Sequence, residues 1–284
     1  QMAAMLRSPT YFRLLNDPGA KVGPQEFVVQ GKRHVPFAKD IMDKTEPGGM
    51  TPLTNHILEI RERIQAAESD LRRNGQKAVV VIATDGLPSN EFGESPESVR
   101  QDFAAALRLL KVLPVWIVVR LCTNNREVIK YYGDLDRDLE YPVDVIDDFM
   151  NEAREIRNFN KWLTYGRPLH LCREMGYHHR VFDLLDERTL TVEELREFLG
   201  LLFGKEAFNN APDPHADWKG FVAFLELIVS QERQQWNPTS RTMCDWIDIR
   251  KLNSTYAGGL IGTIVHRVSD MGLARGERRL QQRE

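Results

Sequence analysis

Residues 78–86 read AVVVIATDG, and this short stretch decides the fold class. Ala78–Ala83 is a continuous apolar run, rich in β-branched residues, without the apolar–polar alternation of a half-exposed strand. A run of this kind between turn residues is typical of a strand covered on both faces, as in a parallel sheet flanked by helices. Thr84, Asp85 and Gly86 follow it and predict a turn at the carboxyl end of the strand.

A helix is predicted on the N-terminal side of this strand, because apolar residues recur there on one helical face. The face consists of Leu53, Ile57, Ile60 and Ile64. Thr51 is expected to cap the helix, with Pro52 in its first turn. Gly75 is expected to end it in a left-handed conformation.

Further helices and strands alternate on the C-terminal side. A helix is predicted over 96–111 with Ser95 as its cap, then a second apolar strand at Val115–Val119. A helix over 126–132 and a short strand at Val143–Ile146 follow. This alternation predicts an α/β fold with a doubly wound, mostly parallel sheet of the Rossmann-like kind.

The character of the sequence changes near residue 148, after which helical patterns dominate. At 284 residues the chain has room for about two domains. We therefore expect an α/β domain over 1–157, a smaller all-α domain over 158–257 and a flexible tail over 258–284.

Composition and charge exclude several classes of protein. A net charge of −3 argues against a nucleic-acid partner and against an anionic membrane surface. Both apolar runs are far shorter than the roughly 20 residues of a membrane span. The three cysteines are widely separated, which is typical of a reducing compartment, and we expect a cytoplasmic protein.

The sequence also lacks the common enzyme signatures. It has no GxxxxGK phosphate loop, no GxGxxG after a strand, no GxSxG elbow and no HExxH pair. We therefore expect a protein that is not an enzyme.

Two loops carry the residues best suited to binding. Residues 48–54 read GGMTPLT and include Gly48, Gly49 and Thr51, while residues 84–86 read TDG. Ligands of open α/β sheets bind outside the carboxyl ends of the strands, where a hydroxyl and a carboxylate can converge. Such hard oxygen ligands suit Mg²⁺, Mn²⁺ or Ca²⁺. From the residues alone, an N-cap at Thr51 and a plain turn at Asp85 explain the two loops better than a metal site does.

The order of these motifs resembles the von Willebrand factor A domain, in which a GGxTPLT-like loop precedes a β-run that ends in TDG. The resemblance covers residues 1 to about 155. It implies a three-loop metal site in which Thr51 supplies the second loop and Asp85 the third. It also implies that a carboxylate of a protein partner completes the coordination of the metal.

One element of that family is missing from the sequence. There is no DxSxS motif, which in the family follows the first strand and supplies the other ligands. The resemblance implies that this strand lies upstream of Gln1 and would stand between the strands expected at Tyr11–Leu15 and Ala78–Ala83. The chain then holds two of the metal-ligand positions, and both retention and loss of the metal remain open.

A second candidate metal site lies at residues 183–194. An EF-hand reading gives Asp183, Glu187 and Glu194 as calcium ligands. Leu185 at a ligand position and Arg188 in place of the turn glycine depart from that pattern. The same residues predict a capping box, in which Thr191 and Glu194 open a helix.

Together these features predict a non-catalytic protein–protein interaction module with divalent-metal-mediated ligand binding in the intact parent domain. One alternative is an interaction or scaffold protein that binds no metal. Another is a calcium-responsive regulator working through residues 183–194.

Overall fold

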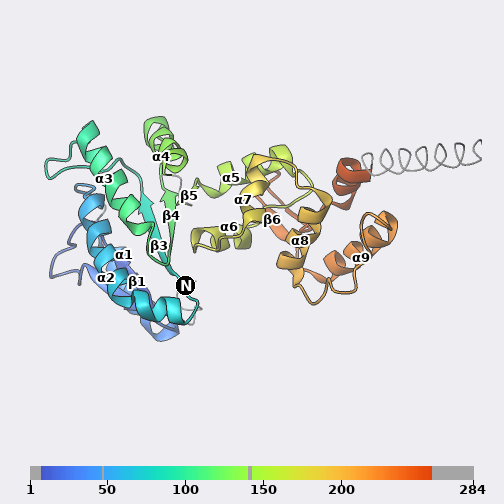
Figure 1. Ribbon diagram of the computed structural model, residues 1–284, viewed down its shortest axis with the longest axis horizontal. Helices are drawn as coiled ribbons and strands as arrows, with labels where there is room; N and C mark the ends of the chain where they lie inside the picture. Colours follow the sequence, from blue (N-terminus) through green and yellow to red (C-terminus); the bar gives the residue numbers. More distant parts are fainter. Residues whose placement is uncertain (1–7, 47, 140–142, 258–284) are drawn as a thin grey trace, which may run out of the picture. The chain divides into compact units, whose positions relative to one another are not determined.

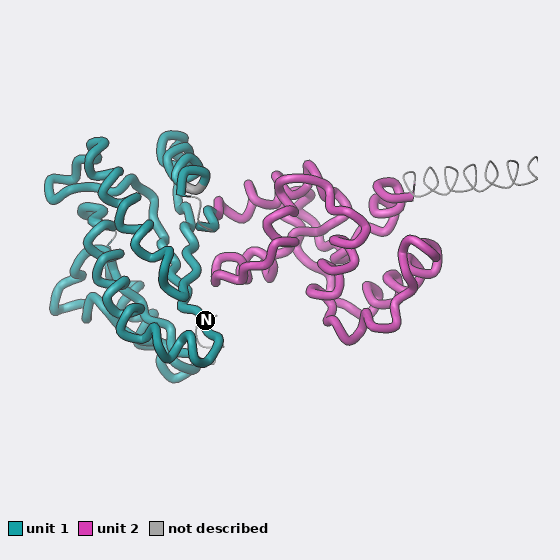
Figure 2. The backbone as a smooth tube through the Cα atoms, in the orientation of Figure 1, with its two compact units in different colours: residues 1–145 teal, residues 146–284 magenta. Residues whose placement is uncertain are grey.

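The computed structural model describes residues 8–46, 48–139 and 143–257. The chain divides into two compact units, residues 1–145 and 146–284, coloured teal and magenta in Figure 2. The boundary lies earlier than the expected residue 157. The reason is that Ala153 and Ile156 belong to the hydrophobic cluster of the second unit. The expected tail at 258–284 lies outside the described residues.

The first unit begins with a small antiparallel pair of strands. β1 (Thr10–Arg13) pairs with β2 (Glu26–Val29), and a short 3-10 turn, η2 (Lys32–His34), leads into α1 (Val35–Lys44). Residues of β2 and α1 form a small cluster of their own, which contains Phe27, Val29 and Ile41. This pair is therefore separate from the sheet formed by the apolar run at 78–84.

The apolar run forms the expected strand of a three-stranded sheet. β3 (Ala78–Thr84) pairs in parallel with β4 (Val115–Leu121), and β5 (Val143–Ile146) lies on the other side of β4. The first unit is thus mixed α/β with a parallel sheet, and the predicted strands at 78–83, 115–119 and 143–146 are confirmed.

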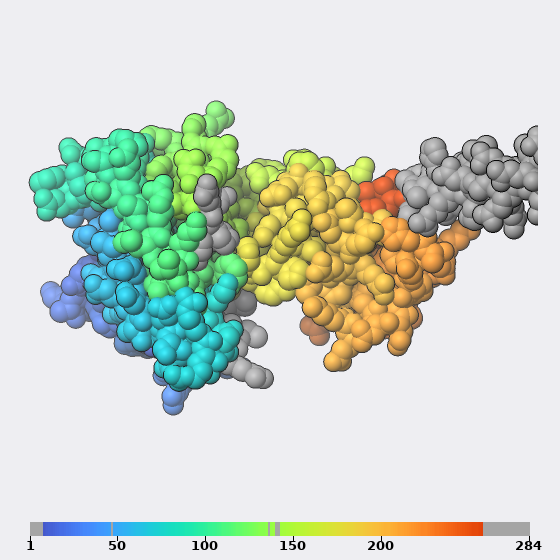
Figure 3. Space-filling view, in the orientation of Figure 1, coloured from blue at the N-terminus to red at the C-terminus, as the bar shows by residue number. Residues whose placement is uncertain are grey.

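Three helices alternate with these strands (Figure 1). They are α2 (Leu53–Arg73), α3 (Glu97–Leu110) and α4 (Arg126–Asp138). α2 contacts α3, and their surfaces adjoin in the space-filling view (Figure 3). Their apolar faces join Val80 and Ile82 of β3 in one core.

One face of β3 differs from the prediction. Val79 and Val81 are 43% and 42% exposed, although the apolar run predicted a strand covered on both faces. Among the described residues β3 pairs only with β4, so it is the edge strand of its sheet. Val79 and Val81 lie on the face opposite to Val80 and Ile82, and this second face is left open to solvent.

Of the predictions for the helix ends, one is confirmed and two are wrong. Gly75 takes the left-handed conformation after α2, with φ of 61°, as predicted. Thr51 does not cap α2: Pro52 stands at the cap position and no side chain bonds there. Ser95 does not cap α3, whose cap position is Pro96. Both predictions were wrong because a proline extends the non-helical segment by one residue.

The second unit is mainly helical. Its helices include α5 (Phe149–Phe159), α6 (Arg167–Glu174), α7 (Arg180–Glu187), α8 (Val192–Phe203) and α9 (Trp218–Gln231), and residues 249–257 are also helical. The all-α prediction was wrong in one respect, because β6 (Gln235–Asn237) and β7 (Thr242–Cys244) form an antiparallel hairpin. The hairpin was missed because each strand has only three residues. No helix within the described residues is both long and apolar enough to cross a membrane.

Candidate functional site

The loop before α2 and the loop after β3 lie against each other. A Cβ atom built on Gly86 would lie 3.5 Å from the Thr51 Oγ1. The Ser89 amide donates to the Thr51 carbonyl at 2.9 Å, and the Thr51 amide donates to the Ser89 Oγ at 2.8 Å. The structure therefore brings Thr51 to the carboxyl end of β3, beside the TDG turn.

The Thr51 hydroxyl is not used to hold this loop. The loop contacts of Thr51 run through its backbone, and α2 begins after it without a side-chain cap. Among the described residues its Oγ1 has no hydrogen-bond partner. The half-buried hydroxyl is thus available to a ligand at the edge of the sheet.

Asp85 is also available. It is exposed, and its carboxylate forms no ion pair or hydrogen bond with any residue that the structure describes. The turn around it is held by its neighbours instead. The buried Thr84 hydroxyl donates to the Gly86 carbonyl at 3.1 Å, and the buried Tyr132 hydroxyl donates to the same carbonyl at 3.1 Å.

The glycine loop before Thr51 is fixed from a third segment. The Asn16 side-chain amide donates to the Gly48 carbonyl at 3.1 Å and to the Met50 carbonyl at 2.9 Å. Gly49 has φ of 98°, and a Cβ there would lie 2.8 Å from the Asn16 Nδ2. Glycine is therefore required at this position both by the backbone conformation and by the close approach of Asn16.

Sequence reasoning missed the residues that position the two loops. Asn16, Ser89 and Tyr132 act from three separate segments, and none stands in a motif. The only local signal was the NDPG turn at residues 16–19, which predicts a turn but no contact with residue 48.

The donor atoms at this edge are of the type that a hard divalent cation prefers, but they are too few to complete its coordination. A hydroxyl and a carboxylate are oxygen ligands of the type that Mg²⁺, Mn²⁺ and Ca²⁺ prefer. No three His, Cys, Asp or Glu side chains gather into a metal-holding group anywhere in the described ranges. Thr51 and Asp85 would therefore hold a cation that takes its remaining ligands from elsewhere.

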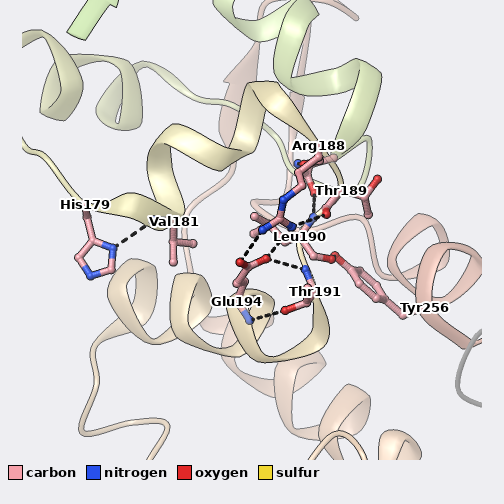
Figure 4. A network of polar contacts seen from close by, with 9 residues as sticks. His179, Val181, Arg188, Thr189, Leu190, Thr191, Glu194 and Tyr256 are labelled. Carbon is pink, nitrogen blue, oxygen red and sulfur yellow. Dashed lines mark hydrogen bonds and ion pairs between the residues drawn. The ribbon is translucent and has the colours of Figure 1, made fainter. Parts of the chain in front are cut away.

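The second candidate site has a different structure. Asp183 and Glu187 lie on α7, so residues 183–187 do not form part of an open calcium loop. Glu194 lies in the first turn of α8, where its carboxylate accepts from the Thr191 amide at 2.9 Å and the Thr191 hydroxyl accepts from the Glu194 amide at 3.3 Å. The predicted capping box is confirmed, as Figure 4 shows.

Arg188 forms an ion pair with the Glu194 carboxylate. Its guanidinium donates to both carboxylate oxygens of Glu194, at 2.8 and 2.6 Å (Figure 4). These bonds hold the pKa of Glu194 at about 2, well below its usual range. Arg188, which departs from the EF-hand pattern at the turn position, thus neutralises the residue that the calcium hypothesis needs as its last ligand.

A buried ion pair joins three helices of the second unit. The Arg173 guanidinium of α6 contacts the Glu152 carboxylate of α5 at 2.5 Å and the Asp186 carboxylate of α7 at 3.3 Å. Glu152 and Arg173 are each 3% exposed. Burial raises the pKa of Glu152 to about 7 in spite of Arg173 beside it. This cluster connects α5, α6 and α7 through buried ionic contacts, which is typical of a group that stabilises the fold.

Comparison of the chain with protein-family models, with characterised proteins and with solved structures gives no match.

Proposed function

We propose that the chain is part of a non-catalytic protein–protein interaction module of the von Willebrand factor A type, with a doubly wound sheet. In this proposal a divalent cation sits between Thr51 and Asp85 and takes a carboxylate from the protein partner. The observation that carries it is the Thr51 hydroxyl beside Gly86, in the turn that also holds Asp85: neither this hydroxyl nor the Asp85 carboxylate has a partner among the described residues.

The rigidity of the loops supports this proposal. A metal site needs ligands held in place, and each loop is fixed by bonds that leave the donor atoms free. Ser89 and Asn16 hold the Thr51 loop, while Thr84 and Tyr132 hold the turn at Asp85. A plain connecting turn would not need these bonds from distant segments.

The edge of β3 also supports it. The resemblance places a further strand, with the remaining metal ligands, beside β3. Among the described residues that edge carries no strand, and Val79 and Val81 beside it are exposed. A strand at this position would satisfy the backbone groups of the edge and bring the remaining ligands to the same end of the sheet as Asp85.

The experiment is a calorimetric titration of the chain with Mn²⁺. We expect saturable binding that is lost in Asp85→Asn, because the amide keeps the shape of the side chain but removes its charge. Asp102→Asn on α3 is the matched control, since Asp102 is also exposed and has no partner among the described residues. Binding that survives Asp85→Asn, or that Asp102→Asn reduces equally, would contradict the proposal.

An interaction module that binds no metal is the second candidate, and the small number of ligands favours it. Only two oxygen donors meet at the loops, and Mg²⁺ requires near-octahedral coordination. Absence of any heat with Mn²⁺ and Mg²⁺ would favour this reading.

A further inference from the structure

A pocket in the second unit is lined by positive charge. It has a volume of about 370 Å³ and lies within the unit formed by residues 146–284. Its wall is formed by Met150, Arg154, Arg157, Asn158, Pro238, Thr239 and Arg241. Among these residues there are three exposed arginines and no carboxylate, so the charge of the lining favours anions.

One wall comes from a single face of α5. Met150, Arg154, Arg157 and Asn158 are separated by four, seven and eight residues from the first, which places them on one side of a helix. Glu155 does not belong to this face. Glu155 follows Met150 by five residues, which places it on another side of the helix, and it does not line the pocket.

The opposite wall is the turn between β6 and β7, and this turn is rigid. The Asn237 Oδ1 accepts from the Thr239 amide at 3.0 Å, from the Thr239 hydroxyl at 2.7 Å and from the Ser240 amide at 3.3 Å. The Arg241 amide donates to the Asn237 carbonyl at 2.8 Å. A turn held in this way fixes the backbone from which Arg241 reaches the pocket.

Arg241 has an unusual backbone conformation. Its φ is 56°, and it is the one non-glycine residue with positive φ in the part of the chain that the structure describes. Glycine or asparagine is the ordinary residue at such a position. An arginine there retains a long cationic side chain at a conformational cost, which points to a use for the charge.

The three guanidinium groups carry charge that the described residues do not neutralise. Arg154 donates to the Asn151 side-chain carbonyl at 2.9 Å, which is a neutral acceptor. The side chains of Arg157 and Arg241 have no ion pair or hydrogen bond within the described ranges. The carbonyl end of α5 contributes about half a negative charge, which three full positive charges outweigh. An anion in the pocket would thus relieve the repulsion between the arginines.

We propose that this pocket binds a small phosphate monoester. Guanidinium groups match the oxygen spacing of a phosphate and can donate two parallel hydrogen bonds to it. Met150 and Pro238 add a small apolar area beside the arginines, and Thr239 and Asn158 supply neutral polar groups. The volume falls in the range of about 300–1,000 Å³ that is typical of small-ligand pockets. The site is independent of the loops at Thr51 and Asp85.

The test uses phenyl phosphate as the probe in a titration followed by NMR of the full chain. We expect saturable shifts confined to residues 150–158 and 238–241. Arg157→Gln and Arg241→Gln should each weaken binding by about tenfold, since each removes a charge-assisted hydrogen bond. Arg250→Gln is the matched control, because Arg250 is an exposed arginine of the same unit outside the pocket. It should bind as the unchanged protein does.

Four results would overturn the proposal. One is the absence of saturable shifts in residues 150–158 and 238–241. Another is an equal loss of affinity in Arg250→Gln. Inorganic phosphate binding as tightly as phenyl phosphate would contradict recognition of an ester. A phosphoserine peptide binding tenfold more tightly than phenyl phosphate would replace the small ligand with a phosphorylated protein. Circular dichroism of each variant separates loss of binding from loss of folding.

Discussion

Two threonines in this molecule each stand just before a helix, and the structure uses them in opposite ways. Thr191 accepts a hydrogen bond from the Glu194 amide and opens α8 as a capping box. Thr51 precedes α2, but the cap position is Pro52 and the Thr51 hydroxyl bonds to no described residue. The same sequence signal therefore marks a polar group used for folding in one unit and a polar group left available for a ligand in the other.

The acidic neighbours of the two threonines show the same difference. Glu194 is held by Arg188 and by the Thr191 amide, so its charge is neutralised inside the protein. Asp85 is exposed and has no partner among the described residues. Polar groups that satisfy one another stabilise a fold, whereas polar groups held in place but unsatisfied are suited to binding.

The largest effect on the free energy of unfolding is expected at the buried ion pair of Glu152 and Arg173, whose charged groups satisfy each other. Arg173→Ala leaves the carboxylate of Glu152 buried without its partner, which costs about 3–5 kcal/mol in free energy of unfolding. Urea denaturation at pH 8 measures it. The double variant Glu152→Gln with Arg173→Met should recover most of the loss, because neither of these two positions then buries a charge. A loss below about 1 kcal/mol, the value of an exposed pair, would mean that the pair is not buried as described.

The raised pKa of Glu152 predicts that the free energy of unfolding depends on pH. Its pKa rises from 4.5 to about 7 on folding. As the pH rises, the unfolded chain loses this proton first, so the free energy of unfolding falls between about pH 4.5 and 7. The comparison is urea denaturation of the unchanged protein and of Glu152→Gln across this range. Glu152→Gln should lack this decrease, and a difference between the two proteins that stays constant with pH would contradict the assignment.

The two threonines themselves give the next effect in size. Thr191→Ala should lower the free energy of unfolding by about 1 kcal/mol, the usual value of an N-cap. Thr51→Ala should change it by less than about 0.5 kcal/mol, because no cap is lost. Thermal denaturation of the two variants side by side measures the contrast. Equal destabilisation by both would show that Thr51 caps α2 after all.

The smallest effect on stability is expected at Arg241. Arg241→Gly relieves a left-handed arginine, which favours folding by about 1 kcal/mol, but it also adds freedom to the unfolded chain. The two terms nearly cancel, so the free energy of unfolding should stay within about 0.5 kcal/mol. Phenyl phosphate binding should nevertheless fall as in Arg241→Gln. Unchanged binding in Arg241→Gly would show that the arginine does not serve the pocket.

Local patterns predicted most of the regular elements. The strands at 78–83 and 115–119 and the helices α2 and α8 follow from local patterns, because each buries an apolar face or run. α7 and the β6–β7 hairpin were missed, since eight helical and three strand residues hold too little pattern to recognise. The open face of β3 was missed because an apolar run does not record whether both faces are covered.

The candidate sites were predictable only where a motif existed. Thr51 and Asp85 stand in recognisable loops, but their approach depends on bonds from Asn16 and Ser89 that no local pattern encodes. The arginine pocket was not predicted at all. Its two walls are at least 80 residues apart in sequence, and only the packing of α5 beside the hairpin turn brings them together.

Broadening of amide NMR signals by Mn²⁺ shows whether the oxygens of Thr51 and Asp85 hold a divalent cation. The paramagnetic ion broadens only nearby signals, so it reports where the cation binds as well as whether it binds. We expect the amides of Thr51, Gly86 and Ser89 to broaden first, and Asp85→Asn to abolish this broadening. Broadening that begins at residues 183–194, or that is as strong there as at Thr51 and Gly86, would contradict it.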